Sequence, residues 1–405
     1  MGDAVNESTP LLLTPRHDDD NVGIVDTEPS TWATGLTLLM SVLGAGMLAI
    51  PYTFQLVPPV WAVVLIALVG ALMTYTAILL LKCYARTGYG SYEEFANAAL
   101  SPWLSTGVQG LIALAIYGAC LGSLTVLRDV TPSILPSKWV QRVGNSTIQA
   151  VVVAVLLGPL CVGQTSPKLT RLRYSSFLGF AFSIYMVFIM CFNGWNVHNT
   201  PLPVIQLEWT HVAQAMSIYN FAFVMHLNVL PLCMEVAKSP REIHSMIWIV
   251  ILTASICTLF YVCFGWSAFA IYGVQVQGNV LLNLKYDFTM QVPRVAVFVT
   301  VLTSFPMLFH PLRRLFASLL PNTSSQALAI GLLVSQMILT STKTGLAMIF
   351  SLTGGTTIVG MCYVLPCVFY LRLMPVVSRG EQGFIGSILV GTILVGLVAV
   401  TTSLV

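Results

Sequence analysis

Two long apolar segments of the chain are interrupted near their middles by residues that free backbone hydrogen-bonding groups. The first segment, residues 32–57, is interrupted at residues 44–46, and the second, residues 211–236, at residues 220–226. In hydrocarbon every backbone N–H and C=O needs a partner, so an interrupted helix is tolerated only where it faces protein or a watery cavity. Freed amides can hold a carboxylate, and freed carbonyls can hold an ammonium group or a cation. The pairing therefore predicts a binding site for a small zwitterion.

Glycine and aromatic residues make up much of the two interruptions. Gly44 and Gly46 have no Cβ, which allows a ligand to approach backbone amides. Their spacing does not place both on one helical face, so helix packing explains them less well than an unwound segment does. Phe221 and Phe223 of the second interruption either face lipid or pack in the core, or one of them walls the substrate pocket, and the sequence leaves these readings open. The predicted substrate-binding residues are Gly44, Ala45, Gly46, Met47, Asn220, Phe221, Ala222 and Phe223.

His226 is an ionisable residue within the second interruption. Its imidazole can titrate near neutral pH, which makes it a possible proton site. The alternative is a neutral histidine that hydrogen-bonds a backbone group freed by the interrupted helix. The sequence contains no recognisable nucleophile–base pair or phosphate-binding loop, so we predict neither an enzyme nor an organic cofactor.

The composition is that of a membrane protein. Of 405 residues, 56% are hydrophobic and only 8% are charged, with a mean hydropathy of +0.84. Soluble domains carry about 25% charged residues, so a water-facing globule is excluded. The net charge of +3 comes without a basic stripe, so the expected surroundings are a lipid bilayer and no nucleic-acid partner is predicted.

Eleven apolar stretches are long enough to cross a membrane as helices. They are residues 32–57, 59–82, 104–127, 148–165, 174–195, 211–236, 245–271, 292–312, 325–342, 346–371 and 383–404. We therefore predict an all-α, multi-pass membrane protein in which residues 31–405 form the transmembrane domain and residues 1–30 a disordered polar tail. Most of the 18 lysines and arginines lie in loops on the same side as the tail, which predicts a cytosolic N-terminus. The sequon at Asn145 is then non-cytosolic and a glycosylation site, whereas the sequon at Asn322 is cytosolic and stays bare.

Several short motifs occur in the order found in a known family. Residues 44–52, 91–95, 221–231 and 235–241 each match weakly alone, but the ordered set extends from about residue 35 to residue 373. With these motifs the chain resembles the amino acid/auxin permease family of the amino acid–polyamine–organocation superfamily. Within that family it resembles the sodium-coupled neutral amino acid transporters.

The resemblance implies a fold and a function. The fold would contain two inverted five-helix repeats, at about 32–195 and 211–371, with the first and sixth helices broken and one extra helix at 383–404. The function would be secondary active transport of amino acids, most consistent with neutral ones, by alternating access. The alternative is a membrane amino acid sensor on the same fold that signals through its cytosolic tail.

The coupling ion is left open between sodium and protons. Sodium-coupled relatives have an asparagine at the position of Met40, and a thioether is a poor ligand for a hard cation. An oxygen site for sodium would combine the carbonyls of Met40 and Leu43 with the hydroxyl of Thr303 or Ser304. Proton coupling, with His226 as the candidate proton site, and facilitated exchange are equally open alternatives.

The tail carries one further motif. Glu7, Leu11 and Leu12 fit the acidic dileucine pattern of endolysosomal sorting signals, for which the partner would be a sorting adaptor. This motif favours a lysosomal or vacuolar membrane over the plasma membrane.

Overall fold

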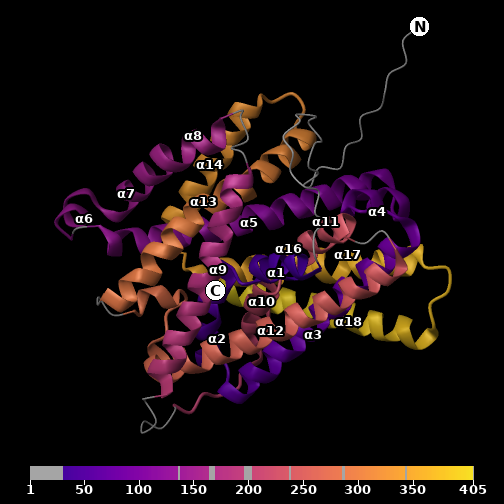
Figure 1. Cartoon of the computed structure of the whole chain (residues 1–405), viewed down its shortest axis with the longest axis horizontal. Coiled ribbons are helices and arrows are strands. Elements are labelled where there is room, and N and C mark those ends of the chain that lie inside the picture. The colour runs from indigo at the N-terminus through magenta and orange to yellow at the C-terminus, as the bar shows by residue number, and fades with distance from the viewer. Residues whose placement is uncertain are drawn as a thin grey trace.

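The computed structural model describes residues 31–135, 137–163, 169–195, 203–236, 239–284, 288–342 and 344–404. Within these ranges the regular secondary structure is entirely helical (Figure 1), as predicted. The predicted tail, and with it the sorting motif at Glu7, Leu11 and Leu12, lies outside the described residues.

The helices follow the predicted apolar stretches closely. In chain order they are α1 (Thr31–Val42), η1 (Ala45–Ala49), α2 (Ile50–Leu56), α3 (Pro59–Thr87), α4 (Tyr92–Ala99), α5 (Pro102–Ile134), α6 (Ser137–Val143), α7 (Asn145–Val152), η2 (Val153–Leu157), α8 (Gly158–Val162), α9 (Leu169–Trp195), α10 (Trp209–Ala222), α11 (His226–Val236), α12 (Pro240–Tyr272), η3 (Gly273–Gln275), η4 (Val280–Leu282), α13 (Phe288–Leu319), α14 (Ser325–Ser341), α15 (Leu346–Gly355), α16 (Thr357–Val359), η5 (Gly360–Val364), α17 (Leu365–Leu373) and α18 (Arg379–Leu404). Here η1, η3 and η4 are 3-10 helices, whereas η2 and η5 are π-helical turns.

Among the described residues, seven helical segments are long and apolar enough to cross a membrane. They are Pro59–Thr87, Pro102–Ile134, Trp209–Val236, Arg241–Gln275, Gln291–Leu319, Leu346–Leu373 and Arg379–Ser403. A bent pair, Trp32–Val42 with Ala45–Leu56, satisfies the same criteria when the two are taken together. Three shorter apolar helices, Thr147–Val162, Gly179–Trp195 and Ser325–Ser341, lie at the remaining predicted spans. The chain is an all-helical membrane protein, and the count of eleven spans stays a prediction.

Both predicted interruptions are present. The first segment bends by 40° where α1 ends at Val42 and η1 begins at Ala45. The second unwinds between Ala222, the last residue of α10, and His226, the first of α11. Figure 1 places α1 and α10 near the centre of the bundle, and η1 contacts α10 directly. The two interruptions therefore face each other inside the protein, where their freed backbone groups are kept away from lipid.

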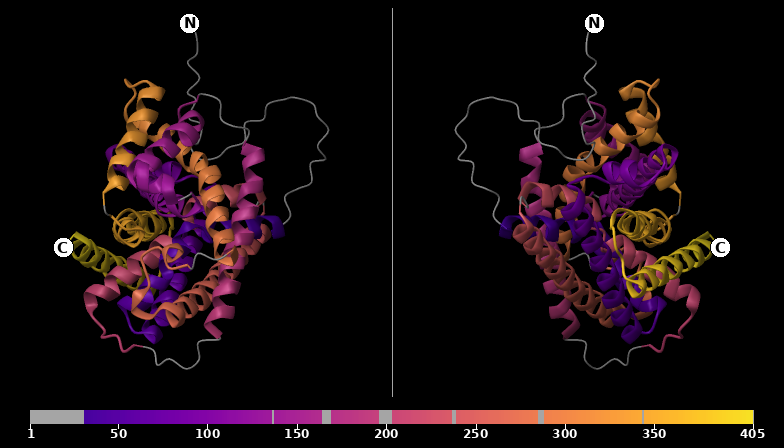
Figure 2. Two further views of the ribbon diagram at one scale, coloured as in Figure 1. Left: turned by 90° about the vertical axis from the view of Figure 1, so that its left-hand side faces the viewer. Right: turned by 90° about the vertical axis from the view of Figure 1, so that its right-hand side faces the viewer.

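Close helix packing holds α15 against both α10 and α18. A Cβ placed on Gly354 of α15 would overlap the backbone carbonyl of Ser217 on α10. A Cβ placed on Gly396 of α18 would likewise overlap the carbonyl of Gly355. Small residues permit this approach, which gives membrane helices their van der Waals contact. Figure 2 shows α18, in yellow, at the outer edge of the bundle.

The tenth predicted span is not one continuous helix. It is divided into α15, α16, the π-helical η5 and α17, with the first break at Thr356. The hydroxyl of Tyr92 in the short helix α4 donates to the carbonyl of Met361 in η5 at 3.2 Å. π-helical turns often occur at functional sites because they free a carbonyl and redirect side chains. The hydrogen bond from Tyr92 to Met361 thus connects α4 to the π-helical turn η5.

Candidate functional site

A cavity of about 420 Å³ lies between the two interruptions. Helices α1, α5, α9, α10, α11, α13, α15 and α16, together with η1 and η5, contribute side chains or backbone to it. None of the described residues that line the cavity carries a charged side chain. Of the predicted substrate-binding residues, those in the lining are Gly44, Ala45, Gly46, Met47, Phe221 and Ala222.

The two predicted glycines have different surroundings. Gly44 adopts an extended conformation and faces the cavity, since the nearest heavy atom to a Cβ placed on it would be the Ser41 carbonyl oxygen at 4.0 Å. A Cβ on Gly46 would instead lie 2.9 Å from the Cα of Ala222. Gly44 therefore keeps space free for a ligand, whereas Gly46 allows η1 and α10 to touch.

The start of η1 presents backbone donors to the cavity. The first backbone hydrogen bond of this 3-10 turn runs from the amide of Met47 to the carbonyl of Gly44 at 3.2 Å. The amides of Ala45 and Gly46 precede it, and the first amides of any helix have no partner within the helix. Both residues line the cavity. Their amides and the positive end of the helix dipole suit a carboxylate.

The structure shows which of the two phenylalanines, Phe221 or Phe223, lines the cavity. Phe221 lines the cavity and stacks on Phe350 of α15, with ring centroids 4.0 Å apart and planes at 15°. Phe223 is fully buried outside the lining and packs edge-on against Tyr261 of α12 at 5.0 Å. Phe221 is thus the cavity wall and Phe223 the core residue. Phe350 was missed by the sequence analysis, because it lies in a uniformly apolar stretch that carries no signal of orientation.

Asn220 lies behind the cavity wall. Its side chain accepts a hydrogen bond from the Tyr363 hydroxyl at 2.9 Å and donates to the Gly354 carbonyl at 3.4 Å. These bonds join α10 to α15 and η5. Direct contact between Asn220 and a substrate stays a prediction.

The predicted sodium-site residues are partly brought together. Met40, Leu43 and Ser304 line the cavity. The hydroxyl of Thr303 lies outside the lining and donates within its own helix, with the Val299 carbonyl at 2.9 Å and the Thr300 carbonyl at 3.0 Å.

Two further hydroxyl residues, which the sequence analysis did not identify, lie beside this group. Thr300 lines the cavity and its buried hydroxyl has no hydrogen-bond partner. Ser183 of α9 also lines it, with its hydroxyl 3.5 Å from the Leu43 carbonyl. Thr300 and Ser304 are four residues apart and share one helical face, a spacing that would have pointed to Thr300.

His226 is fully buried and does not line the cavity. Its Nε2 lies 3.0 Å from the hydroxyl oxygen of Thr76 on α3. That hydroxyl is also close to two backbone carbonyls, of Leu72 and Met73, so its hydrogen is directed toward them and Nε2 is the donor to Thr76. The second nitrogen, Nδ1, then carries a lone pair and has no partner.

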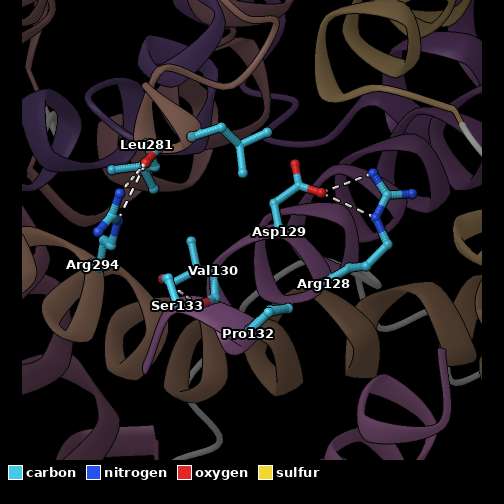
Figure 3. Close-up of a pocket in the computed structure, with 8 residues that line it drawn as sticks. Arg128, Asp129, Val130, Pro132, Ser133, Leu281 and Arg294 are labelled. Atoms are coloured by element: carbon cyan, nitrogen blue, oxygen red, sulfur yellow. Dashed lines mark hydrogen bonds and ion pairs between the residues drawn. The ribbon is translucent and has the colours of Figure 1, made fainter. Parts of the chain in front are cut away.

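A second cavity, of about 260 Å³, lies at the end of α5 that is nearest to Ile134 (Figure 3). Arg128 uses all five of its N–H donors there: two on Asp129, and three on the carbonyls of Thr340, Thr342 and Thr344. The other carboxylate oxygen of Asp129 accepts from Asn279 at 3.1 Å. These bonds tie α5 to the α14–α15 connection and to the turn before η4. The cluster is therefore a structural clamp.

The comparison with protein families decides which family the chain belongs to. Residues 27–405 match the family described as "Transmembrane amino acid transporter protein". The chain belongs to this family. The resemblance predicted from the sequence is thus confirmed.

Two amino acid transporters from Saccharomyces cerevisiae are similar to the chain. "Vacuolar amino acid transporter 6" is 23% identical over 309 residues, which cover 73% of this chain and 67% of the relative. "Vacuolar amino acid transporter 2" is 25% identical over 396 residues, which cover 88% of this chain and 80% of the relative. Among solved structures, MhsT in complex with L-phenylalanine matches with a TM-score of 0.52 and 12% identity, covering 92% of this chain and 98% of that one. That match shows a common fold.

Proposed function

We propose that the protein is a secondary active transporter that moves neutral amino acids across a membrane by alternating access. The observation that carries this proposal is the cavity of about 420 Å³ enclosed by the interruptions of α1 and α10. Paired broken helices with a central site are typical of secondary transporters. Membership of the family supports the amino acid as substrate.

The chemistry of the cavity fits a zwitterion with an uncharged side chain. The amides of Ala45 and Gly46 suit the carboxylate, and the carbonyls of Val42 and Ala222, at the C-terminal ends of α1 and α10, suit the ammonium group. The remaining walls are mostly apolar and include Phe221. A charged side chain would be desolvated in such walls without a partner, which is costly.

Two coupling mechanisms follow from the site. In the first, sodium binds the carbonyls of Met40 and Leu43 and the hydroxyl of Ser304, where Thr300 supplies a further oxygen in place of Thr303. In the second, a proton binds the unpartnered Nδ1 of His226. The hydroxyls around Leu43 favour the first mechanism, because they face the cavity and His226 does not.

We further propose a vacuolar or lysosomal membrane as the location, with the N-terminus in the cytosol. Yeast relatives named as vacuolar amino acid transporters support the vacuole. A sensor on the same fold is the less favoured function, since the family supports transport and the cavity accounts for it.

Uptake by the purified protein in proteoliposomes tests the proposal. A panel of labelled neutral, acidic and basic amino acids would be offered with a sodium gradient, a pH gradient or neither. We expect accumulation of neutral amino acids that requires one of the two gradients. Uptake confined to charged amino acids, or no uptake of any, would contradict the proposal.

A further inference from the structure

Asn228 supplies the one side-chain amide among the described residues that line the substrate cavity. It lies in α11, two residues after His226 begins the helix. No other described residue of the lining carries a nitrogen in its side chain. Asn228 is only partly buried, whereas Val229 and Leu230, which follow it, are buried and lie outside the lining. The exposed part of Asn228 therefore faces the cavity.

Most of the hydroxyl groups in the cavity are committed to backbone carbonyls, but the amide of Asn228 is not. Ser41, Ser123 and Ser304 of the lining donate to carbonyls of their own helices at 2.7, 3.0 and 3.4 Å. The side chain of Asn228 makes no hydrogen bond with any residue that the structure describes. A side-chain amide has two N–H donors and one oxygen acceptor, so Asn228 is able to donate and accept at the same time.

Asn228 also lies beside the second interruption. Its backbone amide donates to the Met225 carbonyl at 2.9 Å, which places it in the first turn of α11. One helical turn is about 5.4 Å long, so Asn228 is within roughly that distance, along the helix axis, of the segment that separates α10 from α11. An amino acid whose backbone groups are bound at the two interruptions can therefore direct its side chain onto Asn228.

A carboxamide is the substrate side chain that matches this arrangement best. Two amides can form a pair of complementary hydrogen bonds, with one N–H···O bond in each direction. An alkyl or thioether side chain in the same place would leave the Asn228 amide unpaired and shielded from water, which costs free energy. A charged side chain would find no opposite charge, because no described residue of the lining is charged.

We propose that Asn228 is a specificity-determining residue that selects amino acids with a carboxamide side chain, glutamine and asparagine, over apolar amino acids of similar size. Its amide pairs with the amide of the substrate side chain, while the interruptions hold the substrate's backbone groups. This role rests on the proposed transport of neutral amino acids and narrows it to polar substrates.

Pairs of similarly shaped substrates test the role. Glutamine resembles methionine in length and asparagine resembles leucine in shape, but only the first member of each pair carries an amide. Uptake of the four labelled amino acids into proteoliposomes gives the ratio of kcat/KM within each pair. The ratios would be compared between the wild-type protein and two variants, Asn228→Leu, which deletes the amide at nearly constant shape, and Asn228→Ala, which deletes it without adding an apolar branch.

Asn97→Leu is the matched control. Asn97 is an exposed residue of α4 outside the cavity lining, where its amide oxygen accepts a hydrogen bond from the Ser105 hydroxyl. The control therefore makes the same substitution at a hydrogen-bonding asparagine that the substrate does not reach.

We expect the wild-type protein to prefer the amide-bearing member of each pair, because a site that hydrogen-bonds a substrate group discriminates against the analogue that lacks it. Both Asn228 variants should lower the two ratios by about tenfold, the usual size of the effect when one hydrogen-bond partner is removed. Asn97→Leu should keep both ratios at their wild-type values, whatever it does to the amount of folded protein.

Two results would overturn the proposal and leave amino acid transport in place. One is a pair of wild-type ratios in both Asn228 variants; a simultaneous rise in the sodium concentration for half-maximal uptake would assign the amide oxygen to the coupling ion instead. The other, which needs no variant, is a wild-type preference for methionine and leucine. No uptake of any amino acid by the wild-type protein would overturn the proposed function itself and the role of Asn228 with it.

Discussion

Gly46 and Ala222 bring the two interrupted helices into contact, since a Cβ on Gly46 would lie 2.9 Å from the Cα of Ala222. The contact is between backbones, so no side-chain rotation can relieve a larger residue there. Gly44, two residues earlier, has open space toward the cavity. Within this motif, glycine is therefore required at position 46 for helix packing and at position 44 for ligand binding.

Alanine at each glycine should separate the two requirements. Gly46→Ala should destabilise the protein by about 1–3 kcal/mol, the usual cost of overpacking. Gly44→Ala should fold normally and raise the KM for substrate by about tenfold, because its methyl group displaces the ligand from one amide, worth ~1.4 kcal/mol. Thermal unfolding in detergent checks the prediction for Gly46→Ala, and uptake in proteoliposomes checks the prediction for Gly44→Ala. The assignment fails if Gly44→Ala transports with an unchanged KM.

The hydroxyls of α13 should determine any sodium dependence. Thr300→Ala combined with Ser304→Ala removes oxygen ligands from the cavity, and we expect the sodium concentration for half-maximal uptake to rise by at least about tenfold. Thr303→Ala is the matched control, because Thr303 lies outside the cavity lining, which includes Thr300 and Ser304. Equal effects of the control and the double variant would rule out the site. If wild-type uptake follows the pH gradient alone, His226→Gln should abolish that dependence.

Glu93 in the short helix α4 should make stability depend on pH. Burial raises the pKa of its carboxyl, and the negative charge of Glu94 raises it further, whereas the Ser91 hydroxyl and the backbone oppose these effects. Neither carboxyl oxygen has a hydrogen-bond partner of good geometry. A raised pKa in the folded state means that the protonated form is stabilised. This contribution is therefore present below the usual carboxyl pKa and is lost as pH rises through the raised one.

Thermal unfolding of the detergent-solubilised protein over a pH series checks this prediction. The wild-type midpoint should fall as pH rises from acidic values, and Glu93→Gln should flatten that part of the curve. Glu94→Gln keeps an oxygen that can accept from the Gly90 amide, as the Glu94 carboxylate does at 2.7 Å, but removes the charge that raises the pKa of Glu93. It should therefore keep the fall of the midpoint and move it to lower pH. A curve for Glu93→Gln that is identical to the wild-type curve would assign the pH dependence to other groups.

Glycosylation tests the predicted orientation. With a cytosolic N-terminus, Asn145 should be modified in a eukaryotic host and Asn322 should stay bare. Asn145→Gln should then abolish the gel shift produced by a deglycosylating enzyme, and Asn322→Gln should leave it intact. The reverse pattern would invert the orientation.

The backbone features of this site were predictable from sequence, but the side-chain orientations were not. The interruptions predicted at residues 44–46 and 220–226 follow from glycine and from polar residues within apolar stretches, because hydrocarbon penalises unpaired backbone groups. The structure places the breaks at residues 43–44 and 223–225, within or beside the predicted ranges. Phe221 and Phe223 lie two residues apart beside an unwound segment, where helical periodicity no longer indicates which one faces the cavity. Phe350 and Tyr261 come from other helices, and only the tertiary packing brings them to the interruptions.

A structure of the purified protein with a transported amino acid tests the central claim most directly. Electron cryo-microscopy should show the ligand between α1 and α10, with its carboxylate at the amides of Ala45 and Gly46 and its ammonium group at the carbonyls of Val42 and Ala222. Ligand density elsewhere, for example in the cavity beside Arg128 and Asp129, with the space between the interruptions empty, would contradict the account.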